Sequence, residues 1–124
     1  MILLDVENVS SAYLAFLGDS VVEVLVREHI VRHPSEKAPA PRALEYVTAV
    51  RQSDAVERLL PLLTEEESDV FRRGRNGVHG QVPKSASAAQ YRRATGMECV
   101  FGWLWLRGEY DRARELFAAA YAIG

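Results

Sequence analysis

The sequence predicts an all-α fold in which residues 1–124 form a single domain. Three observations lead to this expectation. Apolar residues recur at helical spacing, serine and threonine stand where helix N-caps are needed, and the two-residue alternation typical of strands is absent. The chain has 124 residues, of which 48% are hydrophobic, so it is long enough to bury a core.

The first half of the chain is expected to form two helices joined by a loop. Ser10 or Ser11 can cap a helix that runs to about Arg32, shortly before the proline-rich segment 34–41. Pro41 suits the first position of a second helix, because its φ is fixed and its missing N–H has no partner there. This second helix should run to about Leu60, with a break near Ser53, and end at Pro61.

Two capping boxes mark helix starts in the second half. Thr64 with Glu67 opens a short helix that should end at Gly74, and a glycine-rich loop is expected over 74–86. Ser87 with Gln90 opens the next helix, which carries Tyr91 through Leu106 and should stop at Gly108. An amphipathic helix is expected over 109–123.

Several classes of protein are disfavoured by composition. One cysteine allows no internal disulfide, which fits a reducing compartment. The N-terminal residues lack the basic region of a signal peptide, and no apolar run approaches the roughly 20 residues that span a bilayer. We therefore expect a cytoplasmic protein without a membrane partner.

The basic residues are concentrated in one acid-free interval, although the net charge is -2. Between Asp69 and Glu98 there is no acidic residue, and a basic segment of this kind is typical of a polyanion site. Its candidates for contacting phosphate are Arg72, Arg73, Arg75, Asn76, Lys84 and Arg92. The alternatives are a solvated charged face, or a basic helix end that complements the helix dipole.

Two carboxylates interrupt the most apolar runs of the chain. Asp19 lies in the first helix and Glu98 in the helix after Ser87. A carboxylate in an apolar setting needs a partner. If the two helices cross, the acids can converge and hold Mg²⁺, which prefers oxygen ligands and keeps much of its water. Alternatively, each acid caps a helix or pairs locally, for example with Arg92 or Arg93, and spacing alone does not decide between these interpretations.

Several segments together resemble the catalytic domain of the ribonuclease III family, and in particular Mini-ribonuclease III. The segments are Phe16–Val24, Arg72–Asn76, Val82–Lys84, Tyr91–Arg92 and the helix with Glu98, Gly102 and Leu104. The resemblance implies an all-α, Mg²⁺-dependent endonuclease, with Mn²⁺ as a substitute, that cuts double-stranded RNA and leaves 5′-phosphate and 3′-hydroxyl ends. It also implies a homodimer and maturation of precursor large-subunit ribosomal RNA.

By motif position, Asp19 matches the family's catalytic aspartate and Glu98 its catalytic glutamate, and both would hold the metal. Further acids of the full-length ribonuclease III pattern are replaced here by Ala12, Ala15 and Thr95. No segment of the sequence corresponds to that family's double-stranded-RNA-binding domain, so binding should be weak and salt-sensitive, and a ribosomal protein is a possible helper.

Phe16, Met97, Val100 and Phe101 are the candidate dimer contacts. Two rival functions use the same features. The missing acids would suit a non-catalytic RNA-binding factor in ribosome assembly, which should bind duplex RNA without cutting it. A helical protein–protein module should show no salt-sensitive binding of RNA.

Overall fold

The computed structural model describes residues 5–77 and 87–123, and the regular structure in these ranges is entirely helical, as predicted. The short 3-10 turns are η1 (Val6–Asn8), η2 (Glu45–Val47) and η3 (Leu60–Leu62). The α-helices are α1 (Ser11–Arg32), α2 (Pro39–Leu44), α3 (Ala49–Leu59), α4 (Glu65–Asn76), α5 (Ala88–Leu106) and α6 (Tyr110–Ala120). Within these ranges, no helix is both long enough and apolar enough to cross a membrane.

The predicted N-caps start their helices. The Ser10 hydroxyl accepts a hydrogen bond from the backbone N–H of Tyr13 at the start of α1. Both capping boxes form completely, with Glu67 and Gln90 reaching back to the backbone N–H of Thr64 and Ser87. Each box satisfies two N–H groups that the first turn of a helix leaves without partners, so local sequence fixes where α4 and α5 begin.

The second predicted helix is divided at Thr48 and not near Ser53. Thr48 is extended (φ -67°, ψ 154°), and its hydroxyl accepts a hydrogen bond from the backbone N–H of Arg51, so it caps a new helix. The preceding helix begins at Pro39, not Pro41. The break directs α2 and α3 along different paths, and both helices border the groove described below.

Helix α4 continues beyond Gly74, the residue at which it was predicted to end. Gly74 is buried inside the helix, and a Cβ atom there would lie only 2.6 Å from the Cys99 sulfur. The glycine therefore permits close packing of α4 against α5 and does not terminate the helix. As a result, residues 74–76, which were expected in a loop, form the end of α4.

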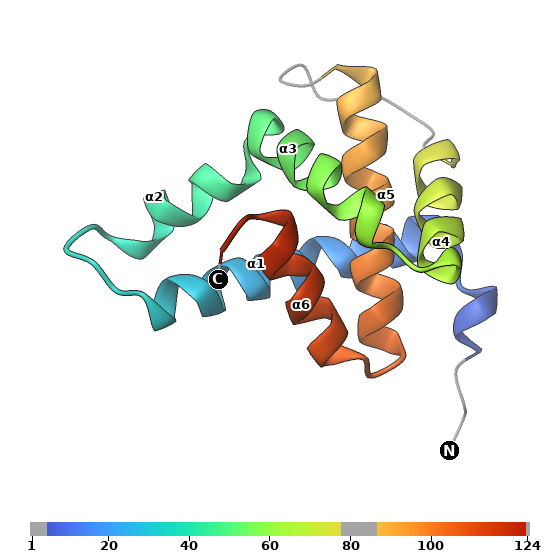
Figure 1. The fold of residues 1–124 in the computed structure, drawn as a ribbon, viewed down its shortest axis with the longest axis horizontal. Coiled ribbons are helices and arrows are strands. Elements are labelled where there is room, and N and C mark those ends of the chain that lie inside the picture. Colours follow the sequence, from blue (N-terminus) through green and yellow to red (C-terminus); the bar gives the residue numbers. More distant parts are fainter. Residues whose placement is uncertain (1–4, 78–86, 124) are drawn as a thin grey trace.

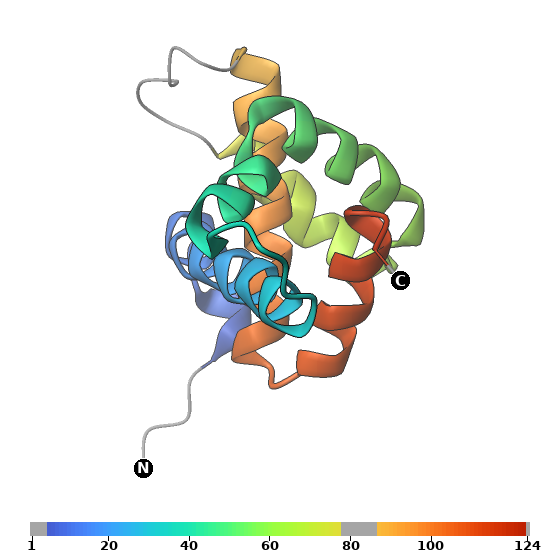
Figure 2. The same ribbon diagram turned by 90° about the vertical axis from the view of Figure 1, so that its left-hand side faces the viewer.

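Helix α5 stands at the centre of the molecule, with α1, α3, α4 and α6 packed around it, whereas α2 packs against α1 (Figures 1 and 2). Its residues Met97, Val100 and Phe101 are completely buried in the core of the single chain. They therefore cannot form the dimer surface proposed for them, since a helix that is apolar all round belongs inside a fold. Of the four candidates only Phe16 is on the surface, with 80% of it exposed.

The crossing of α1 and α5 is unusually close because a glycine lies on each side of it. A Cβ atom at Gly18 would lie 1.7 Å from the carbonyl oxygen of Glu98, and one at Gly102 would lie 2.1 Å from that of Leu14. No side chain fits between the two backbones. The crossing therefore brings Asp19, the next residue after Gly18, up to Glu98.

Candidate active site

Asp19 and Glu98 converge on one groove of about 750 Å³ beside the α1–α5 crossing. Asp19 is exposed, and Glu98 is half-buried. The expectation that the crossing helices bring the two acids together is thus confirmed. The more buried acid, however, is Glu98 and not Asp19, because the exposed side of α1 carries Asp19.

The surroundings of Glu98 favour its protonated form. Burial raises the pKa of Glu98 to about 8, and Asp19 contributes by accepting a hydrogen bond from the protonated carboxyl and by its like charge. Neither acid has an ion pair with a described residue, and Arg93, which the local alternative required, pairs with Glu57 instead. The pair therefore lacks a compensating positive charge from the described chain.

This pKa predicts how stability depends on pH when no metal is bound. The folded protein holds the Glu98 proton up to about pH 8, while a glutamate in the unfolded chain releases it near 4.5. Since the folded state binds more protons between these values, the free energy of unfolding should fall as the pH rises through this window. Since one pKa unit corresponds to about 1.4 kcal/mol, the loss between pH 5 and pH 8 should be about 2 kcal/mol or more.

The measurement is urea unfolding in EDTA at pH 5 and pH 8, for the wild type and for Glu98→Gln. Between pH 5 and pH 8, the free energy of unfolding of the variant should fall by about 2 kcal/mol less than that of the wild type, because glutamine does not titrate. Comparing the two proteins cancels the contributions of other titrating groups. An equal loss in both would show that Glu98 is not the group responsible.

The acid pair suits a hard divalent cation. Both acids offer carboxylate oxygens, and a positive ion would relieve the repulsion that raises the Glu98 pKa. No group of three or more histidine, cysteine, aspartate or glutamate side chains with metal-binding geometry is found among residues 5–77 and 87–123. Two carboxylates leave room for waters, which Mg²⁺ normally retains.

The rest of this groove is mainly apolar, with one neutral polar residue that the sequence analysis did not identify. Its walls come from α1, α2 and α3, and Gln52 of α3 lines it together with the two acids. Nothing in the local sequence distinguishes Gln52 from any other helical glutamine. Only the break at Thr48, which sets where α3 starts, places it here.

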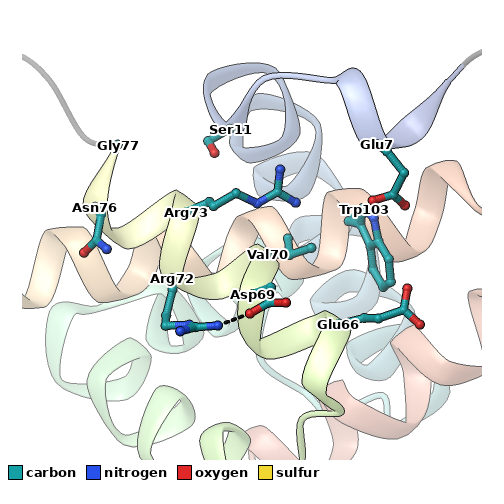
Figure 3. Close-up of a pocket in the computed structure, with 10 residues that line it drawn as sticks. All are labelled: Glu7, Ser11, Glu66, Asp69, Val70, Arg72, Arg73, Asn76, Gly77 and Trp103. Atoms are coloured by element: carbon teal, nitrogen blue, oxygen red, sulfur yellow. Dashed lines mark hydrogen bonds and ion pairs between the residues drawn. The ribbon is translucent and has the colours of Figure 1, made fainter.

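A second groove, of about 840 Å³, lies where η1, α1, α4 and α5 meet (Figure 3). Arg72, Arg73 and Asn76 of the predicted phosphate-binding set line it. Arg72 turns to Asp69 and forms an ion pair with it, whereas Arg73 reaches from α4 toward the start of α1. No ion pair to another described residue engages Arg73, so its guanidinium remains available to an anion.

The other predicted phosphate-binding residues are more scattered. Arg75 is half-buried, and its Nε donates a hydrogen bond to the side-chain oxygen of Asn76 at 3.2 Å. Arg92 is exposed on the first turns of α5 and does not line the second groove. Lys84 lies outside the described residues. Trp103 is only 3% exposed but also borders this groove.

The single cysteine has a structural role. Cys99 is completely buried, and its thiol donates a hydrogen bond to the backbone oxygen of Ser11 at 3.2 Å. Burial, with a smaller contribution from Glu98, raises its thiol pKa to about 12. Because the thiolate is the nucleophilic form, this residue is unsuited to nucleophilic catalysis.

Comparisons with known proteins agree with this arrangement. The Ribonuclease III domain model matches residues 12–109. The chain is 41% identical to Mini-ribonuclease 3 of Symbiobacterium thermophilum, over 86% of this chain and 84% of that protein. It is 37% identical to Mini-ribonuclease 3 of a Thermoanaerobacter species, over 94% of this chain and 83% of that protein.

A crystal structure of a protein from Fusobacterium nucleatum has the same fold, with a TM-score of 0.81 and 93% of each chain covered, at 23% identity. The matched family segment contains both Asp19 and Glu98. The chain therefore belongs to the ribonuclease III family, in its Mini-ribonuclease 3 branch, and is an endoribonuclease.

Proposed function

We propose that this endoribonuclease cuts double-stranded RNA with the help of Mg²⁺, or of Mn²⁺ in its place, and that precursor large-subunit ribosomal RNA is its substrate. The observation that carries the proposal is the convergence of Asp19 and Glu98 on one groove with no compensating cation among the described residues. The single cysteine, buried as a thiol, is consistent with a reducing compartment, and we propose the cytoplasm.

In this mechanism, Asp19 and the more buried Glu98 would hold the divalent ion. When bound, the ion supplies an activated water for attack on the phosphodiester and stabilises charge on the leaving 3′ oxygen. The close α1–α5 crossing fixes the separation of the two acids, since neither backbone can move toward the other. The apolar walls beside Glu98 limit the access of bulk water and so strengthen its electrostatic interactions.

The RNA backbone is proposed to lie along α4 and across the second groove. Arg73 supplies a guanidinium fork for one phosphate, and the other candidates for phosphate contacts are Arg72, Arg75, Asn76, Lys84 and Arg92. Duplex RNA is recognised mainly through its shape, phosphates and 2′-hydroxyls, so such contacts can serve without reading bases. Because these contacts are few, we propose that the RNA is bound weakly and that a ribosomal protein helps to bind it.

Arg73→Ala should weaken binding to duplex RNA about tenfold at low salt, because one charged contact to phosphate is lost. The slope of log affinity against log salt should become shallower by about one. Fluorescence anisotropy with labelled duplex RNA in Ca²⁺ or EDTA measures both quantities. Arg32→Ala, at an exposed position at the far end of α1, is the matched control and should leave the slope unchanged.

We also propose that the protein is a homodimer that pairs through α1. Tyr13, Phe16 and Val24 follow one another along one stripe of this helix and are 73%, 80% and 50% exposed. Large exposed apolar side chains in a row indicate a protein contact. In a two-fold dimer the same stripe would serve both subunits, which would bring both acid pairs close to the interface.

Phe16→Asp should convert the dimer to a monomer, because it places a charge in the apolar stripe. Light scattering coupled to size-exclusion chromatography measures the mass, and circular dichroism checks that the helices are retained. Val50→Asp, at a position that is 66% exposed on α3, is the control and should remain dimeric. A monomeric wild type, or a dimeric Phe16→Asp variant, would contradict this assignment.

The substrate proposal is tested with purified protein, labelled duplex RNA and matched single strands at low salt in Mg²⁺. Cleavage confined to the duplex, with 5′-phosphate products, is the expected result. A transcript that carries the ends of precursor large-subunit ribosomal RNA should be cut at discrete positions. Binding without cleavage would favour the assembly-factor alternative, for which Ala12, Ala15 and Thr95 would be the reason.

A further inference from the structure

The polar side chains of the acid-pair groove are few, and two of them are occupied with each other. Glu23 and Arg27 form an ion pair at 2.6 Å on the exposed side of α1. The remaining polar lining residues are Asp19, Glu98 and Gln52, which come from α1, α5 and α3 respectively. Among the described residues, no hydrogen-bond partner is found for the Gln52 side-chain amide.

The position of Gln52 is held firmly by its own helix. It lies in the first turn of α3, where its backbone N–H bonds to the Thr48 carbonyl at 2.9 Å. The guanidinium of the preceding residue, Arg51, lies 4.8 Å from the ring centre of Tyr46 and 6.0 Å from that of Tyr121. The start of α3 is therefore anchored to η2 and to the end of α6, so the backbone that carries Gln52 is already ordered before a ligand binds.

We propose that the Gln52 amide oxygen is a third, uncharged donor to the divalent cation held by Asp19 and Glu98. This inference rests on the proposed metal-dependent activity. Mg²⁺ and Mn²⁺ prefer oxygen donors, and an amide carbonyl is one of the types that proteins provide. An amide also suits this place better than a third acid, since another negative charge would add to the repulsion between the two carboxylates.

The same inference accounts for the reduced set of acids in this chain. Ala12, Ala15 and Thr95 offer no carboxylate, so the ligands come from elsewhere or from water. The structure places Gln52 on a third helix, in the lining of the same groove as the acid pair. An amide at this position raises affinity for the ion without requiring an additional proton to be released on binding.

The test is Mn²⁺ binding to the full chain, measured by electron paramagnetic resonance without RNA. Gln52→Met keeps the length of the side chain but removes the oxygen, and it should weaken Mn²⁺ binding by about tenfold. Gln52→Glu restores an oxygen donor and should bind Mn²⁺ at least as tightly as the wild type. Ser53→Ala, the half-buried neighbour outside the groove lining, should bind like the wild type.

Unchanged Mn²⁺ affinity in Gln52→Met would overturn the inference, whatever its effect on cleavage. If that variant bound Mn²⁺ normally but needed more RNA for its half-maximal rate, the amide would belong to the RNA contacts instead. Thermal melting in EDTA checks that each variant is folded, and Gln52→Glu carries the test alone if the methionine variant is not. Should the wild type neither bind Mn²⁺ nor cut RNA, the proposed function itself would fail.

Discussion

Asp19→Asn should abolish cleavage of duplex RNA while the fold remains intact. Asparagine has the same shape but lacks the charge that holds a divalent ion, so transition-state stabilisation of about 4 kcal/mol or more is lost. This corresponds to a rate reduction of about 10³-fold or more. Because Asp19 is exposed, its replacement should leave the melting temperature in EDTA nearly unchanged. Single-turnover cleavage at saturating Mg²⁺ is the measurement.

The matched control for this prediction is Glu23→Gln. Glu23 lies one helical turn beyond Asp19, borders the same groove and pairs with Arg27, so it tests whether any acid on this face matters. The control should retain cleavage. Cleavage by Asp19→Asn at the wild-type rate would remove Asp19 from the mechanism, and an equal loss in both variants would show that the effect is general electrostatics.

Gly18→Ala adds one methyl group, and it should destabilise the protein more than a methyl group added at any other described glycine. Its Cβ atom would lie 1.7 Å from the Glu98 carbonyl oxygen, so α1 and α5 must separate and the core around the crossing must open. We expect the free energy of unfolding to fall by about 3 kcal/mol or more. For a chain of this size this lowers the melting temperature by roughly 10 °C. Thermal unfolding in EDTA measures the change.

The expected loss of stability is opposite to the usual effect of this substitution. In the interior of a helix, alanine is normally more stable than glycine by about 1 kcal/mol. Ser20→Ala, at an exposed position two residues further along α1, is the control and should be neutral or slightly stabilising. A Gly18→Ala variant as stable as the wild type would mean that the helices are not in the close contact described. The variant should also lose activity, since separating the helices separates the acids.

The starts of α1, α4 and α5 could be predicted from the sequence because their causes are local. The pairs Thr64–Glu67 and Ser87–Gln90 each satisfy their own N–H groups, and no other part of the chain is needed. The prediction that Gly74 ends α4 was wrong because the role of this glycine is not determined locally. Glycine terminates helices locally, but here its role depends on Cys99, which is distant in sequence and touches it only in the folded chain.

The acid pair was predictable and its surroundings were not. Asp19 and Glu98 stand out because each interrupts an apolar run, and the resemblance gives both the same role. Gln52 has no such contrast with its neighbours and reaches the groove only through the break at Thr48. The prediction that residues of α5 form the dimer contact was wrong for a similar reason, since these residues are buried in the core. The sequence of an apolar helix does not show whether the helix packs in the core or at an interface.

We propose that Asp19 and Glu98 together form a metal-dependent nuclease site. The most direct test incubates labelled duplex RNA at low salt with the wild type and with Glu98→Gln, each in Mg²⁺ and in EDTA. Cleavage should occur only with the wild type in Mg²⁺, and both proteins should be folded and should bind the RNA. Cleavage by the wild type in EDTA, or equal cleavage by Glu98→Gln in Mg²⁺, would contradict it.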